Sequence, residues 1–496
     1  MLGMALIILS AVFAYFLIGN YFPSFILTVI FITLGTLIIR NKKEVKRIDR
    51  TIYLLAIITA LSITLRANGI LTFLNFFATI YLGCYLILDD KIRNRLNIIQ
   101  LIFLPLFFIV RLIQIENKLS YKKITKIKLK ENTVAVIITI IALLLILPLL
   151  SSANPIFKNW VKPFADLINF KDFFDKYFQL DFLPPRLVLF GFMAFFFPKI
   201  LSYLQINPKD DLQQRVYQLA LLIPKIVISL VLAAFFVSQF QLYFASTETL
   251  KTLGLTHSQY AREVFAQLSI VSAIILVLVY FDRNKTKLDK KMTMILLIEG
   301  IFLTLMAAKS DFDYTSMFGF THKRLYGFAT AVWIAGIYLF YGYYQLKQIV
   351  NERLLKPIVF YTAAILIIVN LLNFDYLIYH VNPPRVNGEV DYNYLLFNIS
   401  DDGINYQQML DKAFNFKKEK KTYDWNIKFQ AISKLTWNVR ELRQKYKQLP
   451  ISWFNLSEYQ QYLKTKDINI EKYETVLPGP VIQQMPLGDI EIKETR

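Results

Sequence analysis

Two polar loops hold the side chains best suited to bind a charged ligand. The first runs from Leu253 to Arg262, and the second runs from Phe318 to Gly327 and contains Arg324. An arginine offers a planar fork of donors that matches a phosphate or a carboxylate. Two apolar runs of membrane length separate the loops, so both loops must emerge on the same side of a bilayer. We therefore predict one binding site, with the candidate residues Tyr260, Arg262, Lys309, Asp311, Asp313, Thr321 and Arg324.

A simpler interpretation of the same residues stays open. Arg262 and Arg324 each begin an apolar run at a predicted membrane surface. There an arginine can hold lipid headgroups, or pair with Asp311 or Asp313, without serving any other ligand. The sequence alone does not decide between a ligand site and an anchor.

Two ionisable residues, Glu299 and Lys225, lie within apolar runs. At the middle of its run, the Glu299 carboxyl costs about 2.5–3.5 kcal/mol unless it is neutral or paired. Lys225 follows Pro224 near the start of another run, so it is a candidate counter-charge or can extend its ammonium to the surface. Glu299 and Lys225 are therefore candidates for an intramembrane proton or cation site. The alternative is a glutamic acid that is protonated or hydrogen-bonded between helices for structural reasons.

The histidines and the cysteine do not predict a metal site. The three histidines are His257, His322 and His380, and their spacing forms no local pair of ligands. Cys84 is the only cysteine and lies within an apolar run, which excludes disulfides within the chain and thiolate clusters. We predict no metal, no cofactor and no catalytic group, and we favour a protein that is not an enzyme while leaving that question open.

The composition is that of a membrane protein. Of the 496 residues, 55% are hydrophobic, and the formal net charge is +20. A soluble domain could not bury so many long apolar runs, and runs of roughly 18 residues or more indicate helices that cross a bilayer. We therefore predict an all-α, polytopic transmembrane bundle.

The positive charge lies in short connectors between the apolar runs. From His380 to the C-terminus the chain is nearly neutral, with 17 Lys and Arg against 15 Asp and Glu. Basic clusters such as 40–47 and 283–291 mark the cytoplasmic side of a membrane. We predict anionic lipid headgroups as the partners of these loops and exclude nucleic acid.

These patterns predict about eleven spans, with the N-terminus in the cytoplasm and the C-terminus outside a bacterial cytoplasmic membrane. A segment with basic residues at both ends, Leu96–Ile115, is predicted to lie in or re-enter the cytoplasmic interface, and the aromatic stretch up to Asp181 to lie in the outer one. The predicted spans are Met1–Ile18, Tyr21–Ile39, Thr51–Leu65, Ile70–Leu88, Thr133–Leu150, Arg186–Leu204, Val216–Phe244, Val264–Phe281, Met292–Ala308, Leu325–Tyr344 and Pro357–Leu377.

The chain divides into four predicted segments. They are N-terminal transmembrane helices (1–95), a basic interfacial segment on the cytoplasmic face (96–131), a core transmembrane domain (132–380) and an extracytoplasmic helical tail (381–496). Amphipathic patterns place helices in the tail at Asp391–Phe397, Ile404–Phe414, Trp425–Leu449 and Leu456–Leu463.

Several short motifs resemble a bacterial membrane-protein family of unknown function, the DUF4173 type, which is related to the DUF4153 type. They are Leu-Gly-Leu-Thr-(x)3-Tyr-Ala-Arg at 253–262, Phe-Gly-Phe-Thr-x-x-Arg-Leu-Tyr at 318–326 with Trp333, the segment 150–157, and Asp391-Tyr392-Asn393-Tyr394-Leu395. The likeness runs from about Thr133 to Phe414. The chain has Asn154, Lys309 and Phe318 where the family tends to have Asp, Arg and Tyr. The resemblance implies a fold and a membrane location, and no reaction.

Three functions remain in competition. A transporter or an envelope protein would use Glu299 and the outer loops, and its site would be centred on Arg262 and Arg324. A scaffold or signalling protein would bind a protein or envelope partner through its tail. A lipid-linked transferase would need an acid on its first long outer loop, whereas the first predicted outer loop here is only Gly19-Asn20.

Overall fold

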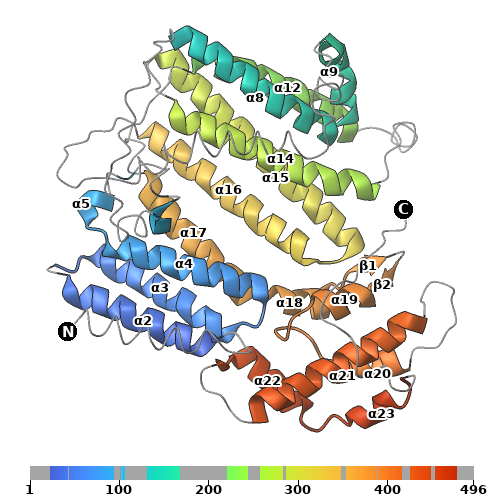
Figure 1. The fold of residues 1–496 in the computed structure, drawn as a ribbon. Coiled ribbons are helices and arrows are strands. Elements are labelled where there is room, and N and C mark those ends of the chain that lie inside the picture. Colours follow the sequence, from blue (N-terminus) through green and yellow to red (C-terminus); the bar gives the residue numbers. More distant parts are fainter. Residues whose placement is uncertain are drawn as a thin grey trace, which may run out of the picture. The chain divides into compact units, whose positions relative to one another are not determined.

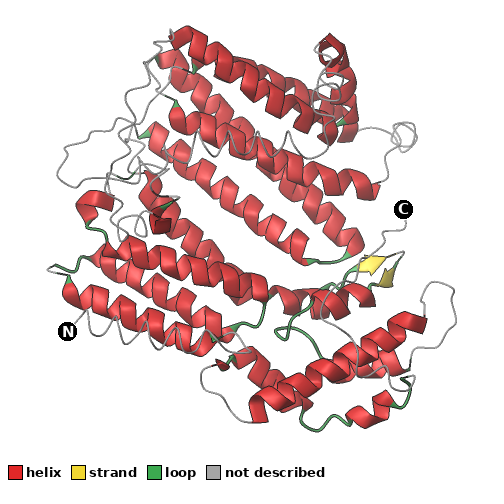
Figure 2. Ribbon diagram, viewed as in Figure 1, coloured by secondary structure: helices red, strands yellow, loops and turns green. Residues whose placement is uncertain are grey.

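The computed structural model describes residues 23–42, 44–93, 96, 101, 103–106, 131–167, 221–243, 257–282, 286–347, 354–386, 388–415, 425–447 and 453–477. Helices form nearly all of the regular structure in these ranges, with one two-stranded antiparallel sheet (Figures 1 and 2). The first helices are α2 (Ser24–Asn41), α3 (Arg47–Leu65), α4 (Gly69–Ile87), α5 (Asp90–Arg93), α8 (Glu131–Ala153), α9 (Pro155–Leu167), α12 (Leu222–Tyr243) and α14 (His257–Phe281). They are followed by α15 (Lys287–Phe318), α16 (His322–Leu346), α17 (Leu355–Leu372), α18 (Phe374–Tyr376) and the π-helical turn η2 (Leu377–Val381). The C-terminal elements are β1 (Arg385–Val386), β2 (Glu389–Val390), α19 (Tyr392–Asn398), α20 (Tyr406–Phe414), α21 (Trp425–Lys447), α22 (Leu456–Thr465) and α23 (Ile470–Glu474).

Eight helices in the described ranges are long and apolar enough to cross a membrane, and this confirms the predicted all-α membrane protein. They are α2, α3, α4, α8, α12, α15, α16 and α17, and each coincides with a predicted span. The predicted span Val264–Phe281 lies in α14, whose apolar part is shorter, Gln267–Phe281. Two further predicted spans, Met1–Ile18 and Arg186–Leu204, and most of 96–115 lie outside the described residues. The number of eleven therefore stays a prediction.

Side-chain caps set several helix boundaries. Asn68 accepts hydrogen bonds from the first backbone N–H groups of α4, and Thr286 and Asp289 form a capping box at the start of α15. At the end of α17, Asn373 takes a left-handed conformation (φ 44°) and accepts a hydrogen bond from the backbone N–H of Tyr376. This turn ends the helix at Leu372, earlier than the predicted Leu377.

The chain forms two compact units, each discontinuous in sequence. Unit 1 comprises 1–37, 57–77 and 370–496, and unit 2 comprises 38–56 and 78–369. In unit 2, α14 packs against α15 and α8, α12 against α8 and α15, and α15 against α16. Its core contains fully buried Ile228, Leu268, Leu296 and Tyr338. In unit 1, α21 is the central helix of the C-terminal segment and contacts α19, α20, α22 and α23.

The helices of the C-terminal segment occur where the amphipathic patterns predict them, within one or two residues at most ends. The pattern missed α23 and the β1–β2 hairpin, in which Arg385 is opposite Val390. Two-residue strands and a five-residue helix are too short to give a periodic signal. The linear division into four segments and the extracytoplasmic position of the tail remain predictions.

Candidate functional site

The predicted loop site is described only on its second side. Tyr260 and Arg262 lie in α14, and their side chains are outside the described residues, as is the loop 253–256. Arg324 lies in the first turn of α16 and donates hydrogen bonds to the carbonyl oxygens of Phe318 (3.0 Å) and Gly319 at the end of α15. Its guanidinium also lies 4.2 Å from the centre of the Tyr314 ring. Arg324 therefore caps the C-terminal end of α15.

The other residues of this loop site lie around the same helix end. Lys309 and Asp313 form an exposed ion pair one turn apart on α15, while Asp311 is buried and attracted electrostatically to Arg324. Thr321 is the N-cap residue of α16 and makes no side-chain capping bond. These contacts match the structural alternative, in which the charged side chains pair with one another and cap a helix end.

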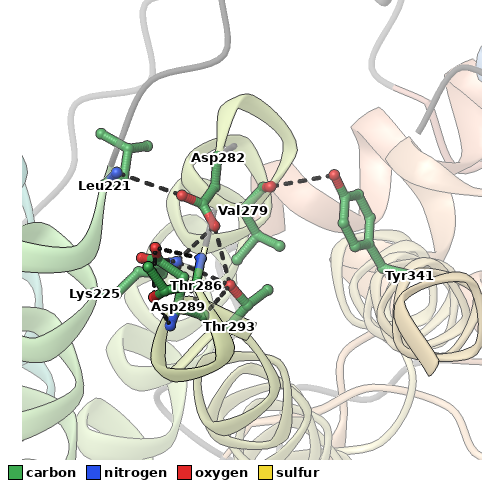
Figure 3. A network of polar contacts seen from close by, with 8 residues as sticks. All are labelled: Leu221, Lys225, Val279, Asp282, Thr286, Asp289, Thr293 and Tyr341. Atoms are coloured by element: carbon green, nitrogen blue, oxygen red, sulfur yellow. Dashed lines mark hydrogen bonds and ion pairs between the residues drawn. The ribbon is translucent and has the colours of Figure 1, made fainter. Parts of the chain in front are cut away.

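Lys225 is held in a network of buried polar groups in unit 2 (Figure 3). Its ammonium lies 2.6 Å from Asp282 Oδ2 and 3.2 Å from Asp289 Oδ1, and it donates to the Thr293 hydroxyl at 3.1 Å. The Thr293 hydroxyl also donates to Asp282. The Tyr341 hydroxyl donates to the carbonyl of Val279, three residues before Asp282. The network joins α12, α14, α15 and α16 at the end where α14 stops and α15 starts.

Glu299, the other intramembrane candidate, lies farther along α15. Its Oε1 accepts a hydrogen bond of 2.9 Å from the Ser229 hydroxyl of α12. Its Oε2 is buried and has no hydrogen-bond partner among the described residues. Lys225, proposed from the sequence as its counter-charge, has Asp282 and Asp289 as ion-pair partners.

Unit 1 contains a cavity that the sequence analysis did not predict. Its volume is about 860 Å³, a size typical of small-molecule pockets. One part of its wall is apolar and comes from α3 and α4: Ile63, Phe73, Phe76 and Phe77. Another part is polar and charged and comes mostly from the C-terminal segment: Ser400, Asp401, Tyr406, Asn438, Glu441, Lys445, Asn455 and Glu458. Ser24, Arg66, Ala67, Gly69, Thr72, Ile399 and Leu442 complete the lining.

The turn between α3 and α4 is fastened to the C-terminal segment, and this fixes one edge of the cavity. The Asp402 carboxylate accepts the backbone N–H groups of Ala67 (2.8 Å) and Asn68 (3.1 Å). Asp375 accepts the Asn68 side-chain amide at 2.6 Å, and the Asn455 amide donates to the Arg66 carbonyl at 2.7 Å. The turn 66–69 and the C-terminal segment, which the charge pattern predicts on one side of the membrane, are thus directly bonded.

Gly403 permits the close approach on which this fastening depends. A Cβ atom at this position would lie 2.4 Å from the carbonyl carbon of Asp375 and 2.7 Å from the backbone nitrogen of Tyr376. Backbone atoms cannot move aside as the end of a flexible side chain can. Any larger residue at position 403 must therefore push its own segment away from Asp375 and Tyr376. The Asp401-Asp402-Gly403 sequence therefore places one acid in the cavity wall and the next on the α3–α4 turn.

The acids of the cavity wall differ in their surroundings. Burial of the Asp401 carboxyl, strengthened by repulsion from Glu458 and Asp402, raises its pKa from 3.8 to about 7. The Tyr406 hydroxyl, which donates to Asp401 Oδ1 at 2.6 Å, opposes this rise, as does the charge of Lys445. Glu458 instead pairs with Lys445 and accepts the Tyr446 hydroxyl at 2.8 Å. Near neutral pH, Asp401 can therefore give or take a proton, while Glu458 has a fixed counter-charge.

No group of three or more His, Cys, Asp or Glu side chains that could hold a metal ion occurs within the described ranges. Of the histidines with described side chains, His322 is buried and stacks on Tyr326, and His380 contacts the rings of Tyr376 and Tyr379. Burial lowers the pKa of His380.

The comparisons with known proteins identify a family without an activity. A family described as "Domain of unknown function (DUF4153)" matches residues 53–410. It is the family that the sequence motifs gave as the relative of the DUF4173 type, and its match begins well before Thr133, where the resemblance was expected to start. No curated protein and no solved structure matches the chain.

Proposed function

Because the chain belongs to the DUF4153 family, whose description names no activity, we propose a function from the geometry. The protein is an integral membrane protein that holds an amphipathic, lipid-type molecule in the cavity of unit 1. One observation carries this proposal: the cavity wall divides into phenylalanine rings from membrane-type helices and charged side chains from the C-terminal segment. A ligand that satisfies both parts needs an apolar chain and a polar headgroup.

The apolar wall suits a hydrocarbon chain. Phe73 and Phe77 lie on one face of α4, their ring centres are 4.5 Å apart, and they are 60% and 49% exposed. Phe76 lies beside Phe77 and extends the same aromatic surface. Covering apolar surface of this kind stabilises a complex by about 25 cal/mol per Å².

The charged wall suits an uncharged, hydroxyl-rich headgroup such as a sugar. Two cations, Arg66 and Lys445, and three carboxyl groups, Asp401, Glu441 and Glu458, line the cavity. An anionic headgroup would meet more acids than bases, and Lys445 is already paired with Glu458. A hydroxyl group can donate to the carboxylates and accept from the cations, so a headgroup rich in hydroxyl groups binds this wall without a net charge.

The proposal includes a position of this cavity on the side of the membrane away from the cytoplasm, and the charge pattern of the connectors supports that position. A bacterial source and a closer likeness to the DUF4173 type belong to the same proposal, which assigns the chain a role in the cell envelope. The tail then forms one wall of the ligand site and need not serve only as a docking segment for another protein.

A lipid-linked transferase is the second candidate. The observation that favours it is the position of the Asp401 carboxyl in a wall of the cavity, where burial raises its pKa to about 7. A carboxyl with such a pKa can accept a proton from an attacking hydroxyl group near neutral pH. Asp401→Asn would abolish a transfer reaction but would leave simple binding of a lipid in place.

The binding proposal is tested by filling the cavity from Gly69. This residue lines the cavity, and a Cβ atom added there meets nothing within 4 Å. Gly69→Trp should therefore occupy the space without disturbing the backbone. Gly83 lies on the same helix, is equally open and does not line the cavity, so Gly83→Trp is the matched control.

The measurement is native mass spectrometry of the full chain released from mild detergent. We expect a lipid-sized adduct on the wild type and on Gly83→Trp, and its loss from Gly69→Trp. Retention of the same adduct by Gly69→Trp, or a wild type that carries no adduct after extraction from native membranes, would refute the proposal.

A further inference from the structure

Helix α15 carries buried polar groups along its whole length. Asp289, Thr293, Thr304, Ser310 and Asp311 are each less than 10% exposed. At 1.5 Å per residue the helix rises roughly 33 Å from Asp289 to Asp311. That rise equals the thickness of a bilayer's hydrocarbon core, about 30 Å. Small residues and Ser or Thr hydroxyls are enough to pack such a helix in lipid, so its acidic side chains are the members that call for an explanation.

Neighbouring helices of unit 2 supply a partner at three successive levels. At the first level the Lys225 ammonium of α12 joins Asp282 and Asp289. At the next level the Ser229 hydroxyl, one turn farther along α12, donates to Glu299. At the third level the Ser272 hydroxyl of α14 lies 2.8 Å from the Thr304 hydroxyl. The polar groups therefore form a series between the packed helices.

Glu299 is the member of this series whose charge is not balanced. It lies near the middle of the apolar part of α15, and one of its two oxygens is buried without a hydrogen-bond partner among the described residues. The Ser229 hydroxyl is a single neutral donor, which does not offset the cost of a carboxylate at that depth. Glu299 is therefore stable there as the neutral acid and costly as the anion.

Three titratable groups described next to α15, those of Lys225, Asp282 and Tyr338, bond to groups other than Glu299. On α12 and beyond the end of α14, Lys225 and Asp282 bond to each other at 2.6 Å. On α16, the Tyr338 hydroxyl donates to the Ser272 carbonyl at 2.6 Å, and its ring lies where a side chain on Gly300 would project. The Glu299 carboxyl is contacted by the Ser229 hydroxyl of α12.

We propose that Glu299 is an intramembrane proton-binding site that loads and releases a proton, rather than a permanently protonated structural acid. The bound proton occupies the oxygen that lacks a partner, and Ser229 keeps its hydrogen bond to the other oxygen in both states. When the proton leaves, water accepts it, and Glu299 remains as the carboxylate. This inference concerns unit 2 alone and does not depend on the ligand proposed for unit 1.

Difference infrared spectroscopy of the full chain in bilayers tests the proposal directly. A protonated carboxyl in an apolar site gives its own carbonyl stretching band, separate from that of exposed acids. Asp311 is also a buried acid, and burial of the Asp401 carboxyl raises its pKa to about 7, so the spectra are recorded in an Asp311→Asn, Asp401→Asn background. In this background we expect the band at acidic pH, its complete loss as the pH is raised through neutrality, and its absence at every pH in Glu299→Gln. Asp313→Asn, which alters an exposed acid on the same helix, is the matched control and should keep the band.

Ser229→Ala provides a readout that does not require Glu299→Gln to fold. Loss of the one hydrogen-bond donor should shift the frequency of the band and move its titration to higher pH, since the ionised form loses its donor. A band that persists at alkaline pH would overturn the proposal and would assign a structural role. A titrating band that survives Glu299→Gln, or one that Ser229→Ala leaves unchanged, would overturn it equally.

Discussion

Lys225→Met tests how strongly the buried charges of unit 2 depend on one another. The Lys225 side chain is 1% exposed and serves two acids, Asp282 and Asp289, whose side chains are 1% and 8% exposed. It also donates to the Thr293 hydroxyl and to the Asp289 carbonyl, each at 3.1 Å (Figure 3). Methionine keeps the length of the lysine stem, so the substitution removes the charge and its donors and leaves little empty volume.

The expected loss of stability follows from the two acids that remain. Breaking a buried ion pair by removing one partner costs about 3–5 kcal/mol, because the other charge stays buried and unpaired. Here one ammonium serves two carboxylates, so we expect a loss near the upper end, about 5 kcal/mol. Acidic pH should restore part of this loss, since a protonated carboxyl no longer carries the uncompensated charge.

Reversible unfolding in mixed micelles, followed by circular dichroism, measures this free energy. Lys290→Met is the matched control, because Lys290 is exposed and adjoins Asp289. The triple variant Lys225→Met, Asp282→Asn, Asp289→Asn should regain most of the lost stability, since no buried charge remains. A cost for Lys225→Met of less than about 1 kcal/mol, or one equal to that of Lys290→Met, would refute the reasoning.

Three further predictions concern the two units separately. Because folding raises the pKa of Asp401 to about 7, the folded state binds its proton more tightly. Its stability should fall by up to roughly 4 kcal/mol as pH rises from about 4 to about 7, and Asp401→Asn should flatten this thermal unfolding profile. Gly403→Ala should cost about 1–3 kcal/mol through its clash with the Asp375 backbone, whereas Gly83→Ala, placed in open space, should be nearly neutral in the same unfolding assay. Arg324→Gln should cost about 1 kcal/mol by releasing the end of α15 and leave the lipid adduct of the cavity unchanged; an unchanged stability with a lost adduct would contradict the capping role.

The membrane helices could be predicted because one physical quantity sets their length. A helix must place enough apolar residues in a layer about 30 Å thick, so α3, α4 and α16 occupy the runs that the sequence shows. The amphipathic helices of the tail could be predicted equally well, since α19, α20 and α22 each bury one face against α21. Their caps, such as Asn405 and Asn455, add a local signal.

The cavity could not be predicted, because its residues meet only through tertiary structure. Arg66, Asp401 and Lys445 come from distant parts of the chain and belong to no motif. The local sequence instead drew attention to Arg262 and Arg324, which follow polar loops between apolar runs. Arg324 caps a helix through two backbone carbonyls, and backbone carbonyls leave no trace in a sequence.

The partners of Lys225 were missed for a related reason. Asp282 precedes the basic connector 283–291 and Asp289 lies within it, and charged residues in such a connector are explained by membrane topology alone. The sequence pattern paired Lys225 with Glu299 instead, because Glu299 lies inside an apolar run. In the fold both acids are buried and pair with Lys225. Charged residues that look like topology signals in the sequence therefore form a buried network.

Polar side chains serve different purposes in the two units. This difference separates the ligand proposed for unit 1 from the proton site proposed for unit 2. In unit 2, Lys225 and its two acids satisfy one another between packed helices. In unit 1, Asp401 and Glu458 line an open volume of about 860 Å³. Polar groups placed around an open volume do little to stabilise a core, because water satisfies them equally well. Filling that volume should therefore remove a ligand and leave folding intact, whereas neutralising Lys225 should impair folding whether or not a ligand is bound.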